Sequence, residues 1–237
     1  MVTPGAHMVS LTAPASFAAE QYQRLRLTVE RLARARGVKV IAVTSPATGD
    51  GKTVTAINLA GALARGSDDR VLLIDADLRR PSVAAQLGIE GTQVGLADAL
   101  SGGHTSIDDV VKRLDAYNLD VIPASAPSGG ISQLLRSPRL EAFLAEARQR
   151  YTYVVIDTPP LLPVPDSAQL ARMVDGVLLV VSARQTARKL VAEALTMLDA
   201  SKVLGIVFNR DARPLFGYYN ASYRAYFRDA PLVVNEP

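Results

Sequence analysis

A glycine-rich segment with one lysine is the strongest chemical feature of the sequence. It reads Ser45-Pro46-Ala47-Thr48-Gly49-Asp50-Gly51-Lys52-Thr53 and stands between a β-branched run and a stretch of helical periodicity. Such a loop turns successive backbone N–H groups and a helix N-terminus toward phosphate oxygens, while the lysine reaches the β- and γ-phosphates. The predicted nucleotide contacts are Thr48, Gly49, Asp50, Gly51, Lys52, Thr53 and Val54, with the Thr53 hydroxyl also placed on Mg²⁺.

Pro46 occupies the position of the first glycine in the strict G-x-x-x-x-G-K-[ST] pattern. The assignment therefore depends on the strand-loop-helix order around the loop. The alternative is a glycine-rich turn before a helix, with no ligand.

Aspartates follow two further apolar runs. Val71–Ile74 leads into Asp75 and Asp77, and Val154–Ile156 leads into Asp157. Carboxylates at the ends of buried parallel strands can hold Mg²⁺ through its waters and accept a proton from an attacking hydroxyl. The alternative is that they cap the following turns. The predicted catalytic residues are Lys52, Asp75 and Asp77, and the predicted metal ligands are Thr53, Asp77 and Asp157. Which of Asp75 and Asp77 acts as the base stays open.

The elements that position these residues are short apolar strands alternating with helices. The predicted strands are Val38–Val43, Val71–Ile74, Leu119–Ile122, Val154–Ile156, Val177–Val181 and Val203–Phe208. Runs that are apolar at nearly every residue predict burial on both faces of a parallel sheet. The predicted helices are 54–64, Ser137–Arg150, Asp166–Met173 and Thr186–Ala200, with Ala18–Ala35 ahead of the first strand. We predict a doubly wound α/β fold of the P-loop NTPase type, with a mostly parallel sheet and helices on both faces.

Composition narrows the function further. The 237 residues contain no cysteine and two histidines, so disulfides and thiolate metal sites are excluded and histidine chemistry is poorly supported. The net charge of +3 is spread along the chain, which argues against nucleic-acid binding. No run approaches the roughly 18 apolar residues of a spanning helix, so a soluble chain is expected. We predict a flexible segment at 1–13, a catalytic domain at 14–212 and a tail at 213–237.

The glycine-rich loop and the two aspartate-containing segments that follow apolar runs form three sequence blocks. In this order and spacing they resemble the catalytic domain of the bacterial tyrosine kinases, or BY-kinases, of capsular and exopolysaccharide synthesis. The resemblance runs from about Glu20 to Asn209. It implies a Walker A motif at Ser45–Thr53, a Walker A′ motif at Asp75–Pro81 and a Walker B motif at Tyr153–Pro160. It further implies ATP and Mg²⁺ as cofactors, tyrosine autophosphorylation as the activity, and contact of Asn209 with adenine.

The tail carries the expected phospho-acceptors. Four of the eight tyrosines fall within nine residues, at Tyr218, Tyr219, Tyr223 and Tyr226. The alternative is a packed helical stripe, because three of them have helical spacing. The resemblance to a family with a C-terminal tyrosine cluster favours acceptors.

ATPases of the MinD/ParA type are near relatives of the BY-kinases and share their fold. They carry a signature lysine five residues before the P-loop lysine, where this chain has Ala47. A MinD/ParA-like ATPase switch without kinase activity is therefore the less favoured alternative. A nucleotide-binding regulatory module without turnover is the third.

The resemblance implies partners as well. These are a transmembrane polysaccharide co-polymerase on a separate chain as activator, a cognate tyrosine phosphatase, and further copies of the chain in a homo-oligomer. The expected location is cytoplasmic, at the inner face of the cell membrane through that partner. The family's ring-packing motif, Glu-x-x-Arg-x-x-Arg, is incomplete here, because the matching residues are Glu20, Gln23 and Arg26.

Overall fold

The computed structural model describes residues 2–66, 69–91, 94–102, 106–127 and 129–211. Its centre is a seven-stranded sheet in the order β3-β4-β2-β5-β1-β6-β7. The strands are β1 (Val40–Thr44), β2 (Val71–Asp75), β3 (Lys112–Leu114), β4 (Leu119–Ile122), β5 (Tyr153–Asp157), β6 (Gly176–Ser182) and β7 (Val203–Asn209). The short β3 pairs antiparallel with β4, and the other pairs are parallel. The predicted α/β fold class is confirmed.

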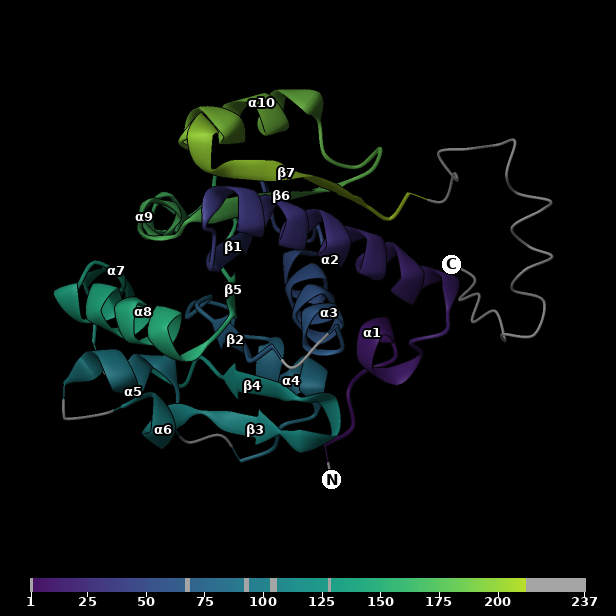
Figure 1. Cartoon of the computed structure of the whole chain (residues 1–237). Helices are drawn as coiled ribbons and strands as arrows, with labels where there is room; N and C mark the ends of the chain where they lie inside the picture. The colour runs from purple at the N-terminus through teal and green to yellow at the C-terminus, as the bar shows by residue number, and fades with distance from the viewer. Residues whose placement is uncertain (1, 67–68, 92–93, 103–105, 128, 212–237) are drawn as a thin grey trace, which may run out of the picture.

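Helices cover both faces of the sheet (Figure 1). One face carries α1 (Val9–Thr12), α2 (Phe17–Arg36), α3 (Lys52–Ala64) and α4 (Val83–Leu87). The other face carries α5 (Leu96–Ser101), α6 (Ile107–Val110), α7 (Ile131–Leu135), α8 (Pro138–Arg150), α9 (Asp166–Met173) and α10 (Arg188–Thr196). Two 3₁₀ turns, η1 (Asp115–Tyr117) and η2 (Ala200–Lys202), complete the described chain. None of the described helices is both long and apolar enough to cross a membrane.

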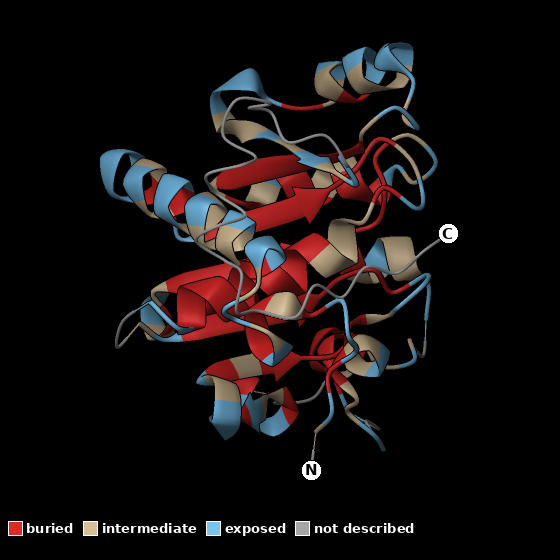
Figure 2. Ribbon diagram, turned by 90° about the vertical axis from the view of Figure 1, so that its right-hand side faces the viewer, coloured by how far each residue is buried: buried red, intermediate tan, exposed pale blue. Residues whose placement is uncertain are grey.

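The central strands divide their side chains between two cores. In β1, Val40 and Ala42 pack against the α5–α10 face, while Ile41 and Val43 pack against the α1–α4 face. Figure 2 shows the resulting buried centre, and exposed residues lie on the outer helices, the loops and the edge strands β3 and β7. Continuous apolar runs are thus explained by burial on both sides of the sheet.

The edge strand β7 departs from that prediction. Ile206 is 38% exposed and Phe208 is 65% exposed, so burial on both faces is wrong for this strand. Val207, which lies between these two residues in the strand, still packs against the α1–α4 core. An apolar run alone does not distinguish a central strand from the last strand of a sheet, because the pattern does not report what covers each face.

The segment before α2 is part of the fold. Met8 is fully buried, and α1 packs on α3. The Ser10 N–H donates to Asn58 Oδ1 at 2.8 Å, and Asn58 Nδ2 donates to the His7 carbonyl at 2.9 Å. The prediction of a flexible segment at 1–13 is therefore wrong for residues 2–13. A helix of four residues is too short to show a hydrophobic period in the sequence.

Two helices also differ from the prediction at their ends. Helix α8 begins at Pro138, one residue after the predicted start at Ser137, and the Ser137 hydroxyl donates to the Leu134 carbonyl at 2.7 Å without capping the helix. Helix α10 is shorter at both ends than the predicted range 186–200, because Thr186 belongs to the turn before it and Ala200 belongs to the 3₁₀ turn η2.

Candidate active site

The predicted phosphate loop connects β1 to α3, with Lys52 as the first residue of the helix and Val54 in its first turn. Gly51 precedes the helix in the left-handed region, with φ of 92°. A Cβ atom on Gly51 would lie 1.9 Å from Asn209 Nδ2, so both the backbone angle and the space require glycine. The loop thereby presents the positive end of α3, which favours a bound anion.

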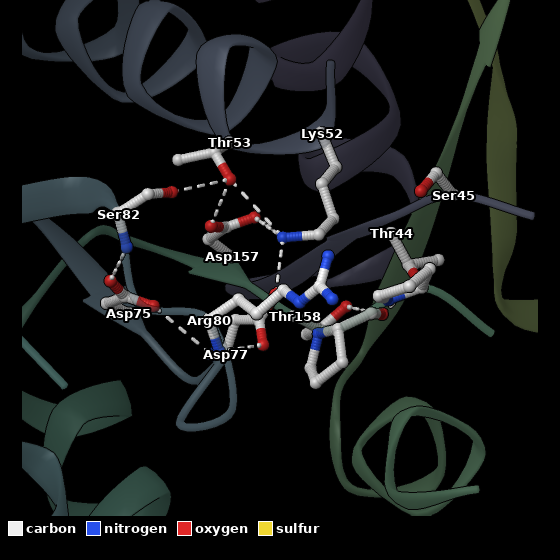
Figure 3. A network of polar contacts seen from close by, with 12 residues as sticks. Thr44, Ser45, Lys52, Thr53, Asp75, Asp77, Arg80, Ser82, Asp157 and Thr158 are labelled. Atoms are coloured by element: carbon white, nitrogen blue, oxygen red, sulfur yellow. Dashed lines mark hydrogen bonds and ion pairs between the residues drawn. The ribbon is translucent and has the colours of Figure 1, made fainter. Parts of the chain in front are cut away.

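Lys52 links the loop to the aspartates. Its ammonium lies 2.8 Å from Asp77 Oδ2 and 3.4 Å from Asp157 Oδ1 (Figure 3). Burial favours the neutral amine, but the carboxylates of Asp157 and Asp77 outweigh burial and hold the pKa of Lys52 above its ordinary value. The side chain therefore stays positively charged in a nearly closed site, as a phosphate ligand must.

The pairing of the strands explains why the aspartates meet. Asp75 ends β2 and is paired in register with Asp157 at the end of β5, and Val43 of β1 is the other neighbour of Asp157. The phosphate loop begins just after β1. All three blocks thus leave the sheet at neighbouring carboxyl ends, where ligands bind in folds of this kind.

A small set of oxygen atoms surrounds the Thr53 hydroxyl. Thr53 donates to Asp157 Oδ2 at 2.7 Å, and Ser82 Oγ lies 3.3 Å from Thr53 Oγ1. Burial raises the pKa of Asp157 to about 7, although the charge of Lys52 opposes the shift. The hydroxyl and the nearby carboxylates are hard oxygen donors of the type that Mg²⁺ prefers.

The described residues contain no group of three or more His, Cys, Asp or Glu side chains arranged to hold a metal. Mg²⁺ in phosphate-binding sites is commonly held by only one or two carboxylates, keeps several waters and binds phosphate oxygens of the substrate. Thr53, Asp77 and Asp157 are the residues that would hold such an ion.

The two aspartates of the Walker A′ block have different surroundings. Asp75 is fully buried and accepts from three backbone N–H groups, those of Asp77 (3.1 Å), Ser82 (3.1 Å) and Val83 (3.0 Å). Burial raises its pKa to about 6, against the opposing hydrogen bonds from Val83 and Ser82. Asp75 therefore fixes the loop that follows β2, whereas Asp77 faces the Lys52 ammonium.

The Asp50 carboxylate points into the protein, away from a ligand on the loop. It accepts from Thr186 Oγ1 at 2.5 Å and from the Ala47 N–H at 3.1 Å. Asn209 Nδ2 donates to the Asp50 carbonyl at 2.9 Å. The end of β7 and the turn after β6 are thus joined to the phosphate loop. This places Asn209 beside the loop, and contact with adenine stays a prediction.

Three residues that sequence reasoning missed support this site. Ser82 contacts Thr53, Thr186 contacts Asp50, and Asp166 pairs with Arg79. Ser82 directly follows the expected Walker A′ segment Asp75–Pro81, and that position is the sequence signal that could have identified it. The acceptor tyrosines Tyr218, Tyr219, Tyr223 and Tyr226 lie outside the described residues.

The parallel sheet, the loop before α3 and the two aspartate-bearing strand ends define a P-loop ATPase. A family model described as "AAA domain" matches residues 38–203. The cell division ATPase MinD of Pyrococcus furiosus is similar in fold, with a TM-score of 0.59 at 23% identity, over 82% of this chain and 81% of MinD. This likeness shows the fold alone.

Closer similarities are to tyrosine kinases. Tyrosine-protein kinase YwqD of Bacillus subtilis (strain 168) is 34% identical over 218 residues, which cover 90% of this chain and 91% of YwqD. The kinase domain of the Escherichia coli tyrosine kinase ETK superposes with a TM-score of 0.78 at 28% identity, over 87% of this chain and 82% of that domain. The chain belongs to the bacterial tyrosine-protein kinases of capsule and exopolysaccharide biosynthesis.

Other relatives are much longer. The succinoglycan biosynthesis transport protein ExoP of Rhizobium meliloti (strain 1021) is 33% identical over 217 residues, which cover 90% of this chain but only 27% of ExoP.

Proposed function

We propose that this chain transfers the γ-phosphoryl group of Mg-ATP to tyrosine hydroxyls, and that Tyr218, Tyr219, Tyr223 and Tyr226 of its own tail are the acceptors. The observation that carries the proposal is the position of the Lys52 ammonium at the start of α3, between Asp77 and Asp157. Family membership supports tyrosine as the acceptor residue type.

Each residue has a role in the transfer. The phenolic oxygen forms a bond to the γ-phosphorus while the bond from that phosphorus to the bridging oxygen breaks, and ADP leaves. Lys52 neutralises charge on the β- and γ-oxygens, and the loop N–H groups position the phosphates. Asp77 is assigned as the acceptor of the phenolic proton, because its carboxylate pairs with the Lys52 ammonium at 2.8 Å, whereas Asp75 accepts three backbone N–H groups of its own loop. Thr53, Asp77 and Asp157 would hold Mg²⁺, which would supply further charge neutralisation at the phosphates.

We infer that the chain acts at the cytoplasmic face of the membrane through a transmembrane co-polymerase. The support is the similarity to one part of ExoP, which is named as a transport protein of succinoglycan biosynthesis. A homo-oligomer would let the tail of one copy enter the site of another. Each phosphorylated tyrosine adds about −1.5 to −2 charge, which would weaken that docking, and a cognate phosphatase would reverse it.

The proposal is tested by replacing the lysine. Lys52→Met removes the charge at the phosphates and is expected to abolish both Mg-ATP turnover and the phosphate-sized mass increments seen after incubation with Mg-ATP. Lys189→Met is the matched control, because Lys189 is exposed on α10 and is not among the residues of the site. Intact-mass analysis and circular dichroism separate loss of chemistry from loss of folding. Undiminished phosphate on a folded Lys52→Met variant would remove the proposed site.

A further inference from the structure

Two adjacent arginines follow Asp77, and their surroundings differ. Arg79 Nη2 lies 2.7 Å from Asp166 Oδ2 and 3.2 Å from Ser132 Oγ. Asp166 is buried and opens α9, and Ser132 lies on α7. Arg79 therefore joins the loop after β2 to two helices on the α5–α10 face, and its guanidinium is committed to a buried carboxylate.

Arg80 is exposed, and its hydrogen bonds to the described residues are made by its backbone N–H. Its N–H donates to Asp77 Oδ1 at 3.1 Å and also reaches the Asp77 carbonyl at 3.1 Å. Within the described part of the chain its guanidinium has no hydrogen-bond or ion-pair partner. Figure 3 shows this side chain extending from the loop across the site toward Lys52.

The backbone contact fixes where Arg80 can act. One oxygen of the Asp77 carboxylate accepts from the Arg80 N–H, and the other pairs with the Lys52 ammonium at 2.8 Å. A single carboxylate thus separates Arg80 from the lysine that reaches the β- and γ-oxygens. The Arg80 side chain therefore lies beside the lysine that would hold the terminal phosphate.

The charge of the site favours a further cation beside Lys52 and the expected Mg²⁺. The carboxylates of Asp75, Asp77 and Asp157 surround one ammonium, and Lys52 already contacts two of them. A triphosphate adds more negative charge than a diphosphate at the same place, even with Mg²⁺ present. A guanidinium offers paired N–H donors that match phosphate oxygens, so an unpaired arginine beside the site is suited to the extra phosphate.

We propose that Arg80 contacts the γ-phosphate and neutralises charge on it during transfer, while Arg79 is a positioning residue that anchors the loop through Asp166. The inference deepens the proposed function and rests on it for the transfer step. The contact with the γ-phosphate can be measured by binding alone.

The test compares the affinity of the whole chain for Mg-ADP and for the non-hydrolysable Mg-AMPPNP by calorimetry. Arg80→Gln is expected to weaken AMPPNP binding by about tenfold or more, because a charge-assisted hydrogen bond is lost. Its affinity for ADP should stay within about twofold of the parent value, since only the terminal phosphate loses a partner. Arg80→Lys should recover part of the AMPPNP affinity, because it restores the charge without the paired donors.

Arg79→Gln is the matched comparison. This variant leaves Asp166 buried and unpaired, so it should lower the melting temperature and reduce the affinities for ADP and AMPPNP by the same factor. Asp166→Asn should have the same two effects. The inference would be overturned if a folded Arg80→Gln variant lost affinity for ADP and AMPPNP equally, or lost affinity for neither. A selective AMPPNP defect in Arg79→Gln at an unchanged melting temperature would also overturn it. Phosphotyrosine formation by the parent chain is measured separately, so failure of the kinase proposal is distinguishable from failure of the Arg80 contact.

Discussion

Asp75 and Asp157 are direct partners in the register of the parallel strands β2 and β5. Each is the last residue of its strand, so the sheet itself sets the spacing of the two carboxylates. Asp77, in contrast, comes from the loop and owes its position to the backbone contacts of Asp75 and to the Arg79 anchor. The site therefore combines two carboxylates that the sheet places with one that the loop after β2 places.

The paired carboxylates make stability depend on pH. Burial raises the pKa of Asp157 to about 7 and that of Asp75 to about 6, from an ordinary value of 3.8. Between pH 3.8 and about 7 the folded chain binds more protons than the unfolded chain, so without Mg²⁺ its stability falls as pH rises through that window. Asp157→Asn removes the cost of a buried charge and should raise the free energy of unfolding at pH 8 by about 2 kcal/mol.

Urea denaturation at pH 5 and pH 8 measures this effect, and the difference between variant and parent should shrink at the lower pH. Mg-nucleotide binding near neutral pH should also release protons from the parent and fewer from Asp157→Asn, which calorimetry in two buffers of different ionisation enthalpy detects. The same pH dependence in both proteins would count against the raised pKa of Asp157.

The contact between Thr186 and Asp50 should stabilise the phosphate loop. Thr186→Val keeps the side-chain shape but removes the donor to a buried carboxylate, at an expected cost of about 1.5–3 kcal/mol of unfolding free energy. Thr186→Ser keeps the hydroxyl and should cost less than about 1 kcal/mol. Thr196→Val is the control, because the Thr196 hydroxyl donates to a backbone carbonyl on exposed α10. If Thr186→Val behaves like Thr196→Val in denaturant melts, the contact does not hold the loop.

The segment before α2 should contribute to the core. Met8→Ala removes a fully buried side chain between α1 and its neighbours, with an expected loss of about 2–4 kcal/mol. Leu27→Ala, at a position that is 57% exposed, should change stability by less than about 0.5 kcal/mol. Thermal unfolding of the two variants compares them directly. Equal melting temperatures would show that residues 2–13 do not stabilise the domain.

Local patterns were sufficient for much of the fold and for the centre of the site. The apolar runs predicted six of the strands, and the rule that parallel strands carry ligands at their carboxyl ends brought Lys52, Asp75 and Asp157 together. The short β3 and the helices α4 to α7 carried too few residues to show a period.

Long-range polar contacts were beyond sequence reasoning. Arg79 pairs with Asp166 across 87 positions of the chain, and Thr186 contacts Asp50 across 136. Nothing in either neighbourhood specifies the partner, because such pairs depend on how helices pack on the sheet. For the same reason the sequence does not distinguish Arg79 from Arg80. In the structure the Arg79 guanidinium pairs with Asp166, whereas Arg80 is bonded to Asp77 through its backbone N–H.

Mapping phosphate on the tail tests the central claim most directly. After incubation with Mg-ATP, phosphopeptide analysis of the parent chain should find phosphotyrosine within residues 218–226. Changing Tyr218, Tyr219, Tyr223 and Tyr226 to Phe should remove that signal while fold and ATP affinity persist, because only hydroxyl groups are lost. Tyr151→Phe is the control, since its hydroxyl donates to Asp120 at 2.9 Å and burial raises its pKa to about 12. A phosphate signal lost with the four tail tyrosines and kept in Tyr151→Phe is the predicted result; undiminished phosphate outside residues 218–226 in the four-Phe variant would contradict it.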